Sequence, residues 1–305
     1  MEGLCMDFTE NGEEIKKVSF IGLGVMGYPM AGHLASKGYS VTVYNRTETR
    51  MKQWLEEHTG KGASTPRKAA EGAQVVCACV GNDDDLREIT MSEEGAFSGL
   101  APGAIFIDHT TASAHIARQL NDICDSKGAS FLDAPVSGGQ AGAENGILTV
   151  MVGGDQKIFE KASPIINSYA RKSEWMGSAG NGQLTKMVNQ ICIAGLLQGL
   201  SEGINFAKNA DLNVQTVLDV ISKGAAQSWQ MENRGITMHQ DEFEFGFAVD
   251  WMRKDLRICL DEAQRNGSLL PISALVDQFY GKIQALGGGR WDTSSLIRLL
   301  HKENN

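Results

Sequence analysis

The feature that most constrains this chain is a glycine-rich turn that follows a short apolar segment. Residues 18–27 read Val-Ser-Phe-Ile-Gly-Leu-Gly-Val-Met-Gly, which is the Gly-x-Gly-x-x-Gly spacing found between a strand and a helix. In such a turn Gly22 permits the tight bend, Gly24 lets the backbone approach a pyrophosphate, and Gly27 allows close helix–strand packing. The helix start adds free N–H groups and positive dipole. We therefore predict a dinucleotide-binding turn, which also includes Leu23, Val25 and Met26.

The residues that follow support this prediction. Met26, Met30 and Leu34 recur at helical spacing, and Gly38 stands where a helix C-cap is expected. The alternating, β-branched segment Val41–Tyr44 then predicts a second strand. Together these segments predict a strand–helix–strand unit of about the ~30 residues that a dinucleotide fold needs.

The residues after the second predicted strand bear on the choice of nucleotide. A site that prefers NAD usually places Asp or Glu there to bind the ribose 2′-hydroxyl, whereas this chain has Asn45-Arg46-Thr47. An arginine fork matches a phosphate, and a carboxylate repels one. We therefore expect preference for NADP(H) over NAD, with Arg46 as the 2′-phosphate ligand and Asn45 and Thr47 as hydrogen-bonding neighbours. The alternative is that Arg46 is a solvated turn residue.

The first half of the chain alternates apolar strands with helix-like segments. Thr65-Pro66 and Ser113 are typical helix starts. Such alternation predicts a parallel, doubly wound α/β sheet of the Rossmann type, with a ligand crevice beyond the carboxyl ends of its strands. The further strands are expected at Val75–Val80, Ala104–Asp108, Ser130–Asp133 and Ile147–Val152.

The second half has a different pattern. From Gln183 onward, apolar residues recur at helical intervals without strand-like alternation, which predicts an all-α C-terminal domain. Its first helix is expected to run to about Asn209. We therefore expect an N-terminal tail at 1–16, a nucleotide-binding domain at 17–180 and a helical substrate and dimerisation domain at 181–305.

Composition excludes several classes of function. A net charge of -9 without a basic run argues against nucleic-acid or anionic-membrane binding. The acidic tail lacks an apolar signal core and an Arg-rich transit pattern, so we expect a cytoplasmic protein. The six cysteines are dispersed without zinc spacing, which predicts reduced thiols and no metal site.

Two further segments carry residues suited to chemistry. Asp133-Ala-Pro-Val-Ser137-Gly138-Gly139 follows a predicted strand, and its hydroxyl and backbone N–H groups can hold a carboxylate; the alternative is a plain glycine-rich turn. Beyond Gly180, the residues Lys186, Asn189 and Gln190 lie at i, i+3 and i+4 and share one helix face. Lysines at such positions are commonly solvated surface charges.

Four motifs in this order resemble those of the β-hydroxyacid dehydrogenases, which include 3-hydroxyisobutyrate dehydrogenase, tartronate semialdehyde reductase and the glyoxylate/succinic semialdehyde reductases. They are the glycine turn at 22–27, the 133–139 segment, Gly180-x-Gly182-x-x-x-Lys186-x-x-Asn189-Gln190, and Lys254-Asp255-Leu256. The resemblance spans about residues 17–300. It implies a Rossmann domain followed by a helical domain, paired as homodimers or homotetramers.

The resemblance also implies roles for single residues. Lys186 matches the catalytic acid/base, and Ser137, Gly138 and Gly139 match the residues that hold the substrate carboxylate. From their shared helix face we expect Asn189 and Gln190 to orient the substrate. The family usually has asparagine at the position of Gln190, so this residue is a departure. The cofactor-side residues are Val80 and Gly81 over the adenosine half, Thr111 near the nicotinamide, Phe247 and Lys254.

The resemblance implies hydride transfer between NADP(H) and a small 3-hydroxy acid or its semialdehyde, such as 3-hydroxyisobutyrate and methylmalonate semialdehyde. Tartronate and succinic semialdehydes, glyoxylate and L-serine are further candidates. The segments Ala225–Trp229 and Phe243–Phe247 are candidates for the pocket lining, although helical-domain aromatics often belong to a core. The alternatives are an imine reductase, a class that resembles the chain but lacks the lysine, and a non-catalytic NADPH-binding module.

Overall fold

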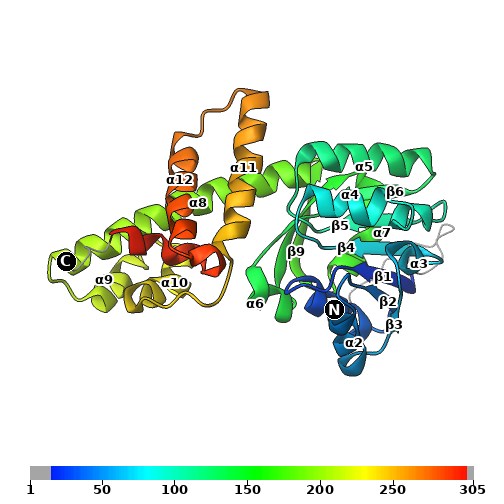
Figure 1. Ribbon diagram of the computed structural model, residues 1–305, viewed down its shortest axis with the longest axis horizontal. Coiled ribbons are helices and arrows are strands. Elements are labelled where there is room, and N and C mark those ends of the chain that lie inside the picture. Colours follow the sequence, from blue (N-terminus) through cyan, green and yellow to red (C-terminus); the bar gives the residue numbers. More distant parts are fainter. Residues whose placement is uncertain (1–14, 301–305) are drawn as a thin grey trace, which may run out of the picture.

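A single mixed sheet organises the first part of the chain in the computed structural model, which describes residues 15–300 (Figure 1). The strand order is β3-β2-β1-β4-β5-β6-β8-β7, with β9 paired to β8. Crossover helices join the parallel strands, as a doubly wound sheet requires. The strands are β1 (Lys17–Ile21), β2 (Ser40–Tyr44), β3 (Lys61–Gly62), β4 (Val75–Ala78), β5 (Ile105–Asp108), β6 (Ser130–Asp133), β7 (Val136–Ser137), β8 (Leu148–Gly154) and β9 (Ala170–Gly177).

The sheet is parallel from β3 to β6, which confirms the predicted Rossmann-type half. Two features differ from the expectation of an entirely parallel sheet. Strand β8 runs antiparallel to both β6 and β7. Strand β9, which pairs in parallel with β8, was not predicted because its side chains are mostly exposed and polar. An edge strand of this kind is held by backbone pairing with its neighbour, and its sequence carries no apolar alternation.

Helices cover both faces of the sheet. The predicted starts are confirmed at Thr65, whose hydroxyl accepts from Lys68 N, and at Ser113, whose hydroxyl accepts from Ile116 N. Neighbouring strand residues such as Phe20 and Ile21 enter two different buried clusters, one on each face. The helices of this part are α1 (Gly27–Ser36), α2 (Glu48–Glu57), α3 (Pro66–Ala70), α4 (Asp83–Met91), η1 (Ala96–Ser98), α5 (Ala114–Ser126), α6 (Gly139–Glu144) and α7 (Gln156–Ile166).

The second part consists of helices gathered around one long helix. Helix α8 (Asn181–Asn209) has 29 residues and ends where the apolar pattern predicts. Figure 1 shows it running from the sheet through the whole helical part. Within residues 15–300, we find no helix both long and apolar enough to cross a membrane. The remaining elements are α9 (Val214–Ile221), α10 (Trp229–Gln240), α11 (Val249–Asn266), α12 (Pro271–Ala285), η2 (Gly288–Arg290) and η3 (Thr293–Leu300).

The expected tail at 1–16 falls largely on residues 1–14, which lie outside the described residues, as does the end of the chain from residue 301. The described chain passes from β9 to α8 through residues 178–180. Beyond this passage, the described elements are helices, and the backbone pairing between Ala248 and Asp292 is an isolated bridge.

Candidate active site

The three glycines of the glycine-rich turn have different surroundings. Gly22 has a φ of 95°, and a Cβ there would lie 2.3 Å from the carbonyl oxygen of Cys79. A Cβ on Gly27 would lie 1.9 Å from the carbonyl oxygen of Gly22. Gly24, in contrast, faces open space with no heavy atom within 4 Å of a Cβ position. Two glycines are therefore required by packing, and the third borders free volume.

The open space beside Gly24 borders a helix N-terminus. It lies beside the start of α1, where no side chain caps the helix N-terminus. The turn itself is fixed by Asn45, whose Oδ1 accepts from Leu23 N at 2.8 Å and whose Nδ2 donates to Thr47 O at 3.0 Å. Val25, in the turn, is exposed. Backbone N–H groups thus border the space, and the end of β2 holds the turn in place.

The end of β2 also presents Arg46. Its side chain is 75% exposed, and Nη1 lies 3.4 Å from Asp85 Oδ1. Asp85 belongs to α4 and also accepts from Gly81 N at 3.2 Å. Asp85 therefore binds the loop that follows β4 to α4, and the same carboxylate forms an ion pair with Arg46.

The loop after β5 is fastened on both sides. Thr110 Oγ1 accepts from Val80 N at 3.0 Å, which joins it to the loop after β4. Asp108 is buried, and its Oδ1 accepts from Thr110 N at 2.9 Å. Burial, assisted by the charge of Asp133, raises the pKa of Asp108 to about 7, although the hydrogen bonds from Thr110 oppose this shift. Loops carrying Val80, Gly81 and Thr111 thus form one connected edge.

A buried carboxylate joins this edge to the long helix. Asp133 Oδ1 accepts from Gly180 N at 2.7 Å, and Oδ2 accepts from Gln183 N at 2.9 Å. The carboxylate therefore caps the N-terminus of α8, where the helix dipole favours a negative charge. Burial nevertheless raises the pKa of Asp133 to about 6. The residue that begins the 133–139 segment is thus also the cap of the helix that carries Lys186.

Gln183 makes a second connection in the first turn of α8. Its Oε1 accepts from Ala112 N at 3.0 Å, and its Nε2 donates to Thr110 O at 2.7 Å. The loops after β5 and β6 are therefore both bound to one helical turn, and Lys186 follows one turn later.

Lys186 is buried, with 7% of its surface exposed. Burial, assisted by the positive charge of Lys254, lowers its pKa from 10.5 to about 8 against the opposing effect of the Asp255 charge. The alternative of a solvated surface lysine is therefore wrong. A buried amine with a pKa near neutrality can give and take a proton at working pH.

The two charged residues that influence the pKa of Lys186, Asp255 and Lys254, belong to a polar network on α8 and α11. Buried Gln190 donates from Nε2 to Asp255 Oδ2 at 2.7 Å and accepts at Oε1 from Asn189 Nδ2 at 2.8 Å. Lys254 Nζ lies 2.9 Å from Asp255 Oδ1 and donates to Thr111 O. The amide of Gln190 is thus engaged at both ends, and the network reaches from α8 through α11 to the loop after β5.

The 137–139 segment lies at the rim of the sheet. Ser137 is half-buried and pairs with Thr149 of β8, while Gly138 and Gly139 are exposed and have positive φ angles of 133° and 61°. No heavy atom lies within 4 Å of a Cβ position on Gly139. The segment is therefore open enough to receive an anion at its hydroxyl and backbone N–H groups.

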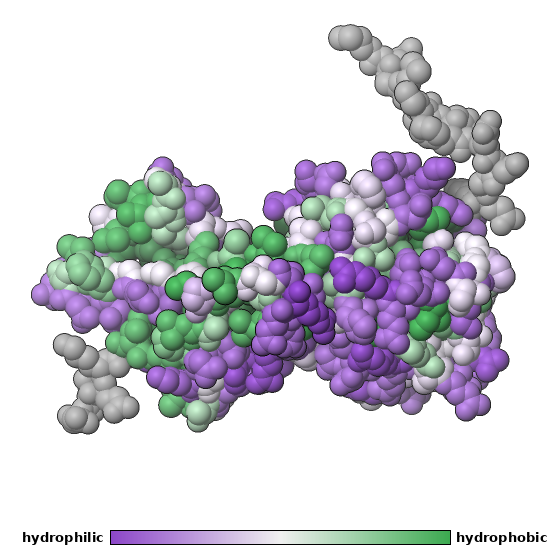
Figure 2. Space-filling model, turned by 90° about the horizontal axis from the view of Figure 1, so that it is seen from above, coloured by the Kyte–Doolittle hydropathy of each residue, from purple (hydrophilic) through white to green (hydrophobic). Residues whose placement is uncertain are grey.

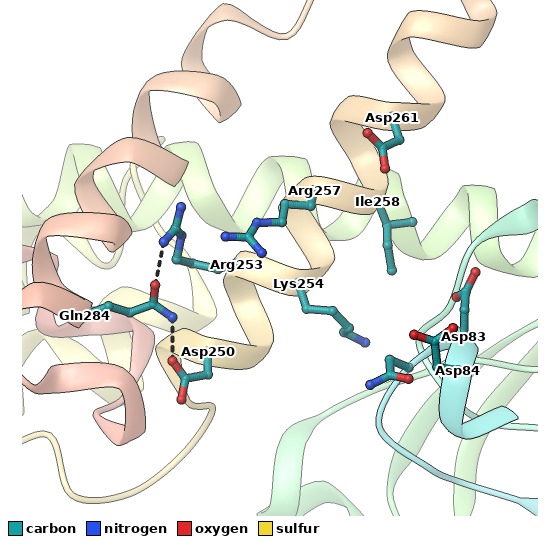
Figure 3. A pocket seen from close by; sticks show the side chains of 10 residues that line it. Asp83, Asp84, Asp250, Arg253, Lys254, Arg257, Ile258, Asp261 and Gln284 are labelled. Carbon is teal, nitrogen blue, oxygen red and sulfur yellow. Dashed lines mark hydrogen bonds between the residues drawn. The ribbon is translucent and has the colours of Figure 1, made fainter. Parts of the chain in front are cut away.

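A cleft of about 260 Å³ separates the start of α4 from α11 (Figure 3). Lys254 extends from α11 toward Asp83 and Asp84 across it. At the same contact, a Cβ on Gly81 would lie 3.2 Å from the Trp251 ring. Helix α11 thus closes over the loop after β4.

The candidate pocket segments have mixed placements. Phe243 is 2% exposed and belongs to the core formed with α8, α9 and α10, so it does not line a pocket. Phe247 is half-buried against the core, and its N–H donates to Asp292 Oδ2 at 2.9 Å. Trp229 is half exposed and lies near the guanidinium of Arg234.

Three residues of the site received no role from the sequence: Asp133, Gln183 and Asp255. All three stand inside recognised motifs, and for Asp133 and Gln183 the available signal is a polar side chain at an apolar strand end or at a helix start. The side chains of Asp133 and Gln183 bind backbone groups that lie 47 to 73 residues away in the sequence. Sequence spacing does not reveal such contacts.

Comparison with known proteins found matches to both parts of the chain. Residues 17–177 match the family described as the NAD-binding domain of 6-phosphogluconate dehydrogenase, and residues 180–300 match the NAD-binding domain of NADP-dependent 3-hydroxyisobutyrate dehydrogenase. An uncharacterized oxidoreductase from Shewanella frigidimarina is 61% identical over 95% of this chain and 99% of its own length.

Two further proteins have more specific names. The probable 3-hydroxyisobutyrate dehydrogenase-like 1, mitochondrial, from Arabidopsis thaliana is 40% identical, covering 95% of this chain and 86% of its own. The structure of Mycobacterium tuberculosis 3-hydroxyisobutyrate dehydrogenase with L-serine superposes with a TM-score of 0.86 at 28% identity, covering 94% of this chain and 100% of that one.

Proposed function

Since the chain belongs to the β-hydroxyacid dehydrogenase family of NAD(P)-dependent oxidoreductases, we propose that it interconverts a small 3-hydroxy acid and its semialdehyde with Lys186 as general acid/base. The observation that carries this proposal is the burial of Lys186, which brings its pKa to about 8. A lysine in that state serves both directions of the reaction near neutral pH.

The proposed cofactor is NADP(H), with NAD as a second possibility. The turn at Gly24 would hold the pyrophosphate, and the end of β2 together with the loop after β4 would hold the adenosine half. Arg46 is the proposed 2′-phosphate ligand because its guanidinium is exposed at that place. The proposed contacts are Gly22, Leu23, Gly24, Val25, Met26, Gly27, Asn45, Arg46, Thr47, Val80, Gly81, Thr111, Phe247 and Lys254.

The substrate carboxylate is proposed to bind at Ser137, Gly138 and Gly139. Both glycines have positive φ angles and Gly139 borders open space, so backbone N–H groups and the Ser137 hydroxyl are the proposed donors. Asn189 and Gln190 face the same side of α8 as Lys186. Because the Gln190 amide is held by Asp255 and Asn189, its proposed part in orienting substrate passes through this network.

The bound nicotinamide supplies or accepts the hydride. In the reductive direction, the Lys186 ammonium donates a proton to the substrate oxygen as negative charge develops on it. In the oxidative direction, the neutral Lys186 amine takes the hydroxyl proton. Asp255 favours the ammonium and burial favours the amine, so the balance of the two sets the working pH. Methylmalonate semialdehyde and its hydroxy acid, 3-hydroxyisobutyrate, form the proposed reference pair.

The proposed oligomer is a homodimer or homotetramer built on the helical domain. Apolar surface gathers on the helical part (Figure 2), and a groove of about 300 Å³ runs between α8, α9 and α10. Phe206 and Val220 are also largely exposed on these helices. Such a surface on a monomer is typical of a subunit interface.

We place the domain boundary at Gly180 and propose a cytoplasmic location.

Initial rates of NADPH and NADH oxidation with methylmalonate, tartronate and succinic semialdehydes and glyoxylate test the function. We expect saturable turnover of one of them by the wild type. Lys186→Ala should lower kcat by roughly 10²–10⁴, which is the usual contribution of a positioned general acid. NADPH binding without turnover of any oxo acid would contradict the proposal and favour imine reduction or a non-catalytic module.

A further inference from the structure

Two carboxylates of α4 hold the residue that we expect to recognise the 2′-phosphate. Arg46 Nη1 lies 3.4 Å from Asp85 Oδ1 and 3.8 Å from Glu88 Oε2. Arg46 follows β2, whereas α4 follows β4, and β1 lies between these two strands in the sheet. The ion pairs therefore span the carboxyl end of β1, directly where the glycine-rich turn begins.

The charges of these side chains reach the end of β2 and the next loop. Burial raises the pKa of Tyr44, the last residue of β2; the charge of Glu88 raises it further and that of Arg46 opposes it. Asp85 also accepts from Gly81 N through its other oxygen. One acidic helix face thus touches both loops between which the adenosine half of a dinucleotide binds.

The nearby Arg50 differs from Arg46 in its contacts. Its Nε donates to Leu23 O at 3.1 Å, its Nη1 donates to Gln53 Oε1 at 2.9 Å, and its guanidinium lies 4.1 Å from the centroid of the Tyr28 ring. Arg50 is therefore committed to supporting the turn. Arg46 keeps an exposed head whose partners are the two α4 carboxylates.

We propose that Asp85 and Glu88 set the nucleotide preference by competing with a 2′-phosphate for Arg46 and by offering acceptors to a ribose 2′-hydroxyl. A doubly charged phosphate that binds Arg46 must approach two carboxylates at close range, which weakens its binding. A neutral 2′-hydroxyl meets no such repulsion and can donate to a carboxylate. The site therefore accepts both NADP and NAD, with the preference for NADP reduced. This inference rests on the proposed role of Arg46.

Dissociation constants of NADP⁺ and NAD⁺, measured by calorimetry on the full chain, test the inference without any knowledge of the acid substrate. Glu88→Gln is the first variant because Asp85 also holds Gly81. We expect it to tighten NADP⁺ relative to NAD⁺ about threefold, within the range of exposed ion pairs. The double variant Asp85→Asn/Glu88→Gln should reach about tenfold, equivalent to about 1.4 kcal/mol. Both gains should shrink at 1 M salt, roughly where the Debye length falls to about 3 Å.

Asp84→Asn is the matched control. Asp84 lies on the same helix, its side chain is 94% exposed, and it pairs with Arg87 at 3.1 Å. The same loss of charge there should leave the ratio of the two affinities unchanged. If Asp84→Asn and Glu88→Gln changed the ratio equally, the specific competition for Arg46 would be refuted.

Arg46→Ala separates this inference from the proposed function. If it weakens NADP⁺ while NAD⁺ binding is kept, Arg46 is the phosphate ligand. An unchanged ratio in Glu88→Gln and in the double variant would then overturn the competition alone. If Arg46→Ala leaves the ratio unchanged, the proposed role of Arg46 fails, and the inference that depends on it fails too.

Discussion

The rates of reduction and oxidation should depend on pH in opposite ways, because each needs a different protonation state of Lys186. Carbonyl reduction needs the ammonium as proton donor, and hydroxy-acid oxidation needs the neutral amine. Burial lowers the pKa of this lysine to about 8. We therefore expect reduction to be constant well below pH 8 and to decline above it, and oxidation to rise with pH and level off above 8.

The magnitude follows from the pKa. One pH unit above the pKa, about one tenth of the lysine remains protonated, so kcat/KM for reduction should fall about tenfold between a low-pH plateau and pH 9. One unit below it, oxidation should run at about one tenth of its plateau. With an ordinary exposed lysine, whose pKa is near 10.4, reduction would stay constant up to about pH 9, and oxidation would still rise about tenfold per pH unit there without levelling off.

Asp255→Asn provides a shift with a defined sign. The charge of Asp255 raises the pKa of Lys186, so its removal should move both limbs to lower pH, by about one unit. The assay is kcat/KM against pH for the identified acid and its oxo form, at saturating cofactor. Two limbs near pH 10.4, or two limbs that fall in the same direction, would refute Lys186 as the proton carrier.

Three further perturbations test the stability and geometry of the site. Lys186→Met removes a buried charge. Because the pKa of Lys186 is 10.5 in its ordinary state and about 8 in the folded chain, the charged lysine lowers the stability of the wild type by up to about 3 kcal/mol below pH 8. The variant should therefore be more stable than the wild type in denaturant unfolding at pH 7 and lose this advantage between pH 8 and 10.5. An equally stable variant at pH 7 would contradict the burial cost. Asp133→Asn leaves one buried N–H without an acceptor, since the carboxylate uses both oxygens, and should cost about 1–3 kcal/mol of unfolding free energy. The control is Asp155→Asn at the start of α7, where a single carboxylate oxygen accepts both N–H groups; this variant should leave the free energy of unfolding almost unchanged. Equal losses of unfolding free energy in the two variants would exclude the bridging role of Asp133. Ser137→Ala should raise the KM of the oxo acid about tenfold or more with a smaller change in kcat, as expected for one lost hydrogen bond to a carboxylate; an unchanged KM would place the carboxylate elsewhere.

The sequence predicted those parts of the fold whose signal is local. Apolar periodicity and caps located β1, β2, α1 and α8, because an apolar face must be buried at its own period. Strand β9 was not predicted because it is an edge strand with exposed polar side chains. The antiparallel direction of β8 depends on its pairing with β6, which no local sequence pattern indicates.

The candidate site divides in the same way. The spacing of residues in the sequence predicts the glycine-rich turn and the helix that carries Lys186, and the family resemblance implies the role of this lysine. The burial of Lys186, the cap formed by Asp133 and the contacts of Gln183 depend on how the sheet and α8 meet. Gln190 shows the difference most clearly. Its sequence position predicts a substrate contact, and only the structure shows that its amide is also held by Asp255 and Asn189.

Single-turnover oxidation of NADPH by wild type and by Lys186→Ala, with and without an added primary alkylamine, tests the central claim most directly. The account predicts that the variant binds NADPH normally, loses about 10²–10⁴ in the rate of the chemical step, and recovers rate in proportion to the protonated amine. A variant that reduces the oxo acid at the wild-type rate would contradict the assignment of Lys186 as the general acid.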